Sequence, residues 1–173
     1  MIALLAVGVG GTFWLTGAPA AWSESTPQDR VDAGLRAIQF DPFQPLSLKP
    51  ITQASLAAVV EGMPLSPGCK KRLNQKLATA SHPQLAWISL RDTDAEDGDV
   101  VRVDSLEYSR TVKLTRAPLL VAVVVVDGGT LSITGIRDGD GNGITLGLKA
   151  DRVERWLPVM HVGQVQHLTI SLH

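Results

Sequence analysis

The sequence has little cysteine, few aromatic side chains and almost no net charge. Cys69 is the only cysteine among 173 residues, so the chain has no internal disulfide. Aromatic residues make up 5% of the chain and apolar residues 45%, which predicts an aliphatic core and few platforms for stacking sugars. The formal net charge of −1 argues against a nucleic-acid partner held by phosphate attraction.

Common catalytic motifs are also missing. The chain has no G-x-S-x-G nucleophile elbow, no phosphate-binding loop and no dinucleotide fingerprint. Its histidines are too scattered to predict a transition-metal site; they are His82, His161, His167 and His173. We therefore expect a protein that is not an enzyme. One alternative stays open, a small hydrolase that uses Asp97 and Asp99 as an acid/base pair.

The N-terminal segment is apolar and resembles an export signal. Residues 2–15 are apolar or small, and Ala18-Pro19-Ala20 fits the small-x-small pattern of a cleavage site. No lysine or arginine precedes the apolar run, and the run is shorter than the roughly 20 residues that a membrane span needs. We interpret residues 1–20 as a signal peptide, with a membrane anchor as the alternative. The protein is then periplasmic or extracellular, and it contacts a membrane only if this segment is uncleaved.

Residues 21–84 predict a helical arm or subdomain of two or three short helices. The first helix would span residues 27–38, and prolines then favour an extended connector over residues 41–50. Residues 52–61 and 68–80 predict two further helices with apolar faces. The last one is basic on its outer face, which is either a solvated surface or a surface for a partner; its cations are Lys70, Lys71, Arg72 and Lys76.

From residue 85 the pattern changes to short strands separated by turn residues. Alternating or wholly apolar segments predict strands at residues 85–90, 100–105, 109–115, 119–126, 130–136, 144–148, 153–160 and 166–172. The apolar run 119–126 suits a central strand or one packed under the helices, and Asp127-Gly128-Gly129 suits a hairpin turn. Residues 85–173 therefore predict a mainly β fold, an antiparallel β-sandwich of seven or eight strands.

Two acidic loops stand out within this region. Residues 92–99 and residues 138–143 contain most of the acidic excess of the chain. In an antiparallel sandwich each strand crosses the full height of the sheet, so successive loops alternate between its two ends. On the predicted strand count both acidic loops lie at the same end.

The residue types in these loops are those that calcium prefers. Calcium takes six to eight oxygen ligands, mainly carboxylates and carbonyls, on a backbone that can bend around the ion. Lys149 occupies the position of the bidentate glutamate of an EF-hand, which excludes that motif but not a calcium site at a sandwich end. The alternative is that Asp-Gly and Asn-Gly simply form turns. The candidate ligands are Asp92, Asp97, Asp99, Asp138, Asp140 and Asn142.

One part of the chain resembles a known group of proteins. The spacing from Asp92 to Asp97-Gly98-Asp99, followed by the alternating valines of residues 100–103, is similar to a turn motif in secreted bacterial β-sandwich modules of uncharacterised function. The run Ile133-Thr134-Gly135-Ile136-Arg137-Asp138-Gly139 is also similar. The resemblance covers roughly residues 87–147. It implies export and a sandwich fold, and it implies no activity.

Together these features favour an exported β-sandwich binding module. Calcium would stabilise its acidic end, and it would engage a protein or a carbohydrate. A second hypothesis is a metal-free structural or interaction subunit of a cell-envelope or extracellular assembly, docked through its helices.

Overall fold

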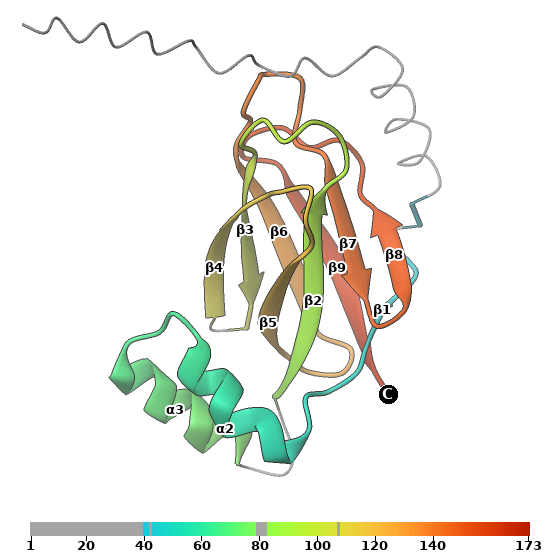
Figure 1. The fold of residues 1–173 in the computed structure, drawn as a ribbon. Coiled ribbons are helices and arrows are strands. Elements are labelled where there is room, and N and C mark those ends of the chain that lie inside the picture. Colours follow the sequence, from blue (N-terminus) through green and yellow to red (C-terminus); the bar gives the residue numbers. More distant parts are fainter. Residues whose placement is uncertain (1–39, 42, 79–82, 107) are drawn as a thin grey trace, which may run out of the picture.

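The computed structural model describes residues 40–41, 43–78, 83–106 and 108–173 (Figure 1). The described part is mainly β, as predicted, with two helices and two sheets. The helices are α2 (Gln53–Gly62) and α3 (Pro67–Leu77). The strands are β1 (Leu46–Leu48), β2 (Gln84–Asp92), β3 (Val100–Ser105), β4 (Tyr108–Lys113), β5 (Leu119–Val125), β6 (Thr130–Arg137), β7 (Leu146–Ala150), β8 (Val153–Trp156) and β9 (Val165–Leu172).

The two sheets share one hydrophobic core. One sheet has the strand order β1-β9-β6-β3-β4 and the other has the order β5-β2-β7-β8. Side chains from both sheets form a single cluster of buried aliphatic residues, in which Ile88 of β2, Val103 of β3 and Ile133 of β6 are all fully buried. The alternation of apolar and polar residues along these strands places one face of each sheet in this core.

The first strand corrects the predicted architecture. Residues 46–48, expected to be part of an extended connector, form β1 and pair with β9 in parallel, Leu46 opposite Ile170. The eight strands β2 to β9 agree with the predicted count, but β1 adds a ninth described strand before the helices, and the fold is not wholly antiparallel. The Leu-Ser-Leu alternation explains the strand, because Leu46 and Leu48 are buried while Ser47 is exposed.

The apolar run at residues 119–126 is an edge strand, not a central one. β5 pairs only with β2, so the alternative prediction, that it lies under the helices, is the correct one. Val121, Val123 and Val125 face the main core. Ala122 and Val124 face the helices. The turn at residues 127–129 is likewise not a hairpin, since it leads from β5 in one sheet to β6 in the other.

The two helices cover the outer face of β2 and β5 at one end of the sheets (Figure 1). A second cluster joins them to the sheet through Val60 and Met63 from the α2 region and Leu85 from β2. Ser66 caps α3 by accepting a hydrogen bond from the backbone N–H of Cys69, and Pro67 is its first residue. None of the described helices is long and apolar enough to cross a membrane. The predicted signal segment and the predicted helix at residues 27–38 lie outside the described residues.

Candidate metal centre

The two acidic loops meet at the end of the sheets opposite the helices (Figure 1). β2 ends in the first loop and β6 ends in the second. Between these two points the chain crosses the fold four times, in β3, β4, β5 and β6, so both loops lie on the same side. The backbone N–H of Gly139 donates to Oδ1 of Asp99 at 3.0 Å. The N–H of Thr145 donates to Oδ2 of the same carboxylate at 3.2 Å. Asp99 thus connects both loops.

Three carboxylates of the first loop form a compact cluster. Asp92, Asp97 and Asp99 each contribute an oxygen, and these three oxygens lie within 4.8 Å of one another. Asp92 and Asp99 are each only 1% exposed, and Asp97 is half-buried. A cation with ligand distances of about 2.3–2.6 Å can contact oxygens up to roughly 5 Å apart. The cluster can therefore hold a metal ion.

The Asp92 side chain has one satisfied oxygen and one unsatisfied oxygen. Oδ1 accepts hydrogen bonds from the backbone N–H of Asp94 at 3.0 Å and from Oγ1 of Thr145 at 2.8 Å. Oδ2 is buried and has no hydrogen-bond partner among the described residues. A buried polar atom without a partner costs about 1–3 kcal/mol, and more when it is charged. A cation bound by the cluster would remove this cost.

Burial and, to a smaller extent, electrostatic repulsion raise the pKa values of the carboxylates in the cluster. Burial, together with the nearby charges of Asp99 and Asp140, raises the pKa of Asp97 to about 7. Burial and the charge of Asp92 raise the pKa of Asp99 to about 6, although two backbone N–H donors oppose the rise. The pKa of Asp92 is also raised, mainly by burial. These groups favour a positive ligand, either protons or a metal ion.

The arginines near the cluster bind mainly to backbone carbonyls. Arg137 donates to the carbonyl of Gly98 through Nη2 at 3.0 Å, and Arg116 donates to the carbonyl of Asp94 through Nε at 3.0 Å. Among the described residues, neither Asp92 nor Asp99 forms an ion pair. The arginines therefore hold the backbone of the loop in place, and the charge of Arg116 offsets only part of the rise that burial causes in the pKa of Asp92.

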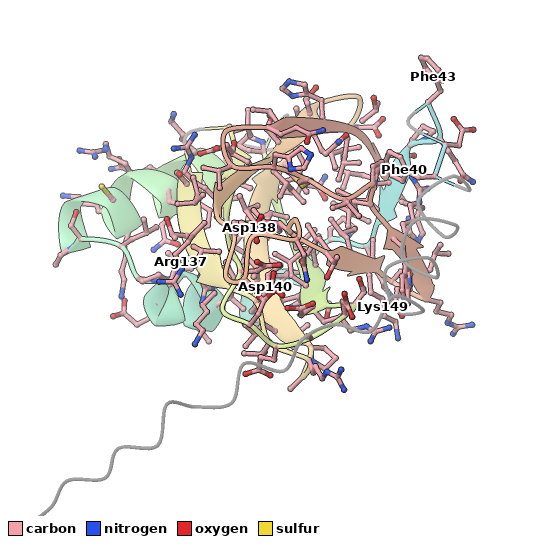
Figure 2. The ribbon with its side chains drawn as sticks, turned by 90° about the horizontal axis from the view of Figure 1, so that it is seen from above. Phe40, Phe43, Arg137, Asp138, Asp140 and Lys149 are labelled. Carbon is pink, nitrogen blue, oxygen red and sulfur yellow. The ribbon has the colours of Figure 1, made fainter. Side chains whose placement is uncertain are left out.

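The second loop mainly supports its own turn. Asp138 accepts hydrogen bonds from the N–H of Gly141 at 2.8 Å and of Gly143 at 2.9 Å, one at each carboxylate oxygen. Asp140 accepts from the N–H and from the amide of Asn142. Viewed from the loop end, Asp138 and Asp140 lie near the centre, with Arg137 to one side (Figure 2). Of these predicted ligands Asp140 interacts with the cluster, since its hydrogen bond and its charge raise the pKa of Asp97.

Sequence reasoning missed two residues that build the site. Thr145 binds Asp92 through its hydroxyl and Asp99 through its backbone N–H. Gly139 lies against Asp97 so closely that a Cβ at this position would be 2.3 Å from the Asp97 carbonyl oxygen. The glycine-rich composition of residues 139–143 indicated a tight loop but not which glycine makes the close approach. Nothing in the sequence marked the threonine.

No protein-family model, curated protein or solved structure matches the chain.

Proposed function

We propose that the protein is an exported β-sandwich binding module whose acidic end is held together by calcium. The two sheets and their shared core support the sandwich. The observation that supports a bound cation is the cluster of Asp92, Asp97 and Asp99, in which Asp92 has a buried carboxylate oxygen without a partner. Three carboxylates this close are stable together only when protonated or bound to a cation.

The chemistry of the site favours calcium over magnesium. Calcium accepts many oxygen ligands in flexible geometry, whereas magnesium demands an octahedron and keeps most of its water. The cluster supplies three anionic oxygens on one loop, and the carbonyl-rich second loop packs directly against it through Gly139. Asp140 interacts with Asp97, and Asn142 donates to Asp140, so both would complete the coordination after a change of rotamer.

The role of the ion in this proposal is to fix the loop end as a binding surface. Loops built on a rigid sheet are common places for recognition. Calcium concentrations outside the cell reach the millimolar range in which extracellular sites of this kind are filled, which fits the export signal expected at residues 1–20. The ordered loops would then contact a protein or a carbohydrate partner.

Thermal melting in calcium and in chelator tests the cation. A ligand present at 100 times its dissociation constant stabilises the folded state by about 2.7 kcal/mol. For a chain of this size that raises Tm by about 5–11 °C. An unchanged Tm at millimolar calcium would refute the proposal. A shift with magnesium that equals the calcium shift would leave a cation site but refute its assignment to calcium.

A metal-free interaction subunit is the second candidate, and the surface of α3 favours it. The helix contains four cations and no acidic residue, and Lys71, Arg72 and Lys76 are exposed. Such a surface fits an acidic partner in an envelope or extracellular assembly. This candidate predicts no calcium shift. The raised pKa of Asp97 favours the alternative of a hydrolase. Gly139 of the second loop packs against Asp97, which argues against a substrate at that position.

A further inference from the structure

A cavity of about 320 Å³ lies between α3 and the edge of the sheets, at the end of the molecule far from the acidic loops. Its lining is mostly apolar and includes Leu73 of α3 and Val124 of β5. The volume is at the lower end of the range of about 300–1,000 Å³ that is typical of small-molecule sites. Along β2, Leu85 under the helices and Asp92 in the acidic cluster are about 23 Å apart, at about 3.3 Å per residue. The two sites are therefore separate.

One wall of the cavity contains a buried hydroxyl without a partner. Tyr108, the first residue of β4, is only 5% exposed. No hydrogen bond of its hydroxyl to the described residues meets normal distance and angle limits, although the guanidinium of Arg110 opposes, through its charge and a hydrogen-bonding interaction, the rise that burial causes in its pKa. Buried hydroxyls nearly always have a partner, so a missing partner needs an explanation. The hydroxyl oxygen is closed off from the cavity in the ligand-free structure, so a ligand oxygen would accept this hydrogen bond after the Tyr108 side chain moves toward it.

The residue next to the opening has a left-handed backbone conformation. Leu106, in the turn between β3 and β4, has a φ of 46° and is 56% exposed. Ser105 pairs with Tyr108, so Leu106 is the first residue of a two-residue hairpin turn, and such turns need a positive φ at this position. Leu106 lines the cavity and exposes an apolar side chain that a ligand would cover. The exposure of Leu106 and its position at the cavity thus agree with a bound apolar ligand.

The other wall is basic. Arg72 and Lys76 of α3 both line the cavity, and α3 contains no acidic residue. The helix also contributes no fully buried side chain, so it covers the sheet without filling the space beneath it. An apolar interior with cations at its edge is complementary to a molecule with an apolar chain and an anionic head.

We propose that this cavity binds a medium-chain fatty acid. The alkyl chain would lie against Leu73 and Val124. The carboxylate would be attracted by Arg72 and Lys76 and would accept a hydrogen bond from the Tyr108 hydroxyl. This site is independent of the proposed calcium site, so its occupancy is the same in calcium and in chelator.

Cys69 gives a direct readout of occupancy, since it is the one cysteine of the chain and lines the cavity. Full-length protein is treated with iodoacetamide, and alkylation is followed by intact mass with decanoate, decanol or decyltrimethylammonium below their micelle concentrations. Decanoate at ten times its dissociation constant should slow alkylation about tenfold. Decanol should protect less, and the cationic amphiphile should not protect. Failure of decanoate to protect, or equal protection by decanol or the cation, would overturn the proposal.

Two variants link this protection to the walls of the cavity, with each rate referred to the ligand-free rate of the same variant. Tyr108→Phe removes only the unpartnered hydroxyl, so it should keep the melting temperature and weaken decanoate binding about tenfold. Arg72→Gln should also weaken it. Lys71→Gln is the matched control, because Lys71 is exposed on the same helix and does not line the cavity. Unchanged decanoate affinity in both Tyr108→Phe and Arg72→Gln, or an equal loss in Lys71→Gln, would contradict the site.

Discussion

Replacing Asp92 by asparagine should stabilise the protein in chelator and remove most of its stabilisation by calcium. Asparagine keeps the shape of the side chain and an oxygen that can accept from Thr145, and its amide takes the place of the unpartnered Oδ2. Two unit charges 4.8 Å apart repel by about 3.5 kcal/mol at an effective dielectric constant of about 20. Because Asp97 is partly protonated near neutral pH, we expect a net stabilisation of about 1–3 kcal/mol in chelator.

In the melting assay this stabilisation corresponds to a rise in Tm of about 2–12 °C for Asp92→Asn in chelator. In calcium the same substitution removes a charged ligand, so the calcium-induced rise of the wild type should largely disappear. Asp151→Asn is the matched control, since Asp151 is exposed in the turn between β7 and β8, away from the loop end, and has a φ of 50° that asparagine tolerates. If Asp92→Asn lowered Tm equally in calcium and chelator, the carboxylate would be structural and the reasoning refuted.

Three further predictions concern the loops. Gly139→Ala would place a Cβ 2.3 Å from the Asp97 carbonyl oxygen and push the loops apart. We therefore expect a loss of about 1–3 kcal/mol of stability in a denaturant titration, and weaker calcium binding. Gly68→Ala is the control and should cost nothing, because there is open space around that glycine. Asp138→Ala removes two hydrogen bonds within the turn, so Tm should fall by a similar amount with and without calcium; a selective loss of the calcium shift would instead make Asp138 a ligand. Because the folded-state pKa values of Asp97 and Asp99 are raised to about 7 and about 6, metal-free stability should fall as pH rises from about 4 to about 7. Calcium binding near pH 6 should release protons, so the calorimetric heat of binding should depend on the buffer. A heat that is the same in every buffer would contradict the raised pKa values.

The strands with local signals could be predicted from the sequence. Residues 100–105 alternate valine with polar residues, and β3 has the predicted bounds. Residues 52–61 have an apolar face that ends before Pro64, and α2 is displaced from the prediction by one residue. In both elements the period of the apolar residues and the residues that end the element are local properties of the chain.

Elements that depend on distant partners could not be predicted in this way. β1 has only three residues, and its partner β9 lies at the other end of the chain. The run in β5 is apolar on both faces because one face meets the main core and the other meets the helices. An apolar run of this kind also suits a central strand, so periodicity alone cannot distinguish the two.

The site could be predicted only in part for the same reason, because a local residue pattern does not show which distant segments pack together. Aspartate and asparagine alternating with glycine suit a calcium loop, and they equally suit a turn in which each carboxylate caps backbone N–H groups. In the structure Asp138 does the second, with both of its oxygens occupied. In the first loop Asp92 and Asp99 are instead buried together, and that burial comes from the packing of the second loop over them.

The two loops therefore have different tasks. The first loop collects three carboxylates that repel one another. The second loop supplies backbone N–H donors to Asp99, and Gly139 allows it to approach closely enough to exclude water. Exclusion of water strengthens the repulsion and, for the same reason, strengthens the attraction for a cation. The burial that makes the metal-free cluster unfavourable is thus also what would make it selective for an ion of high charge.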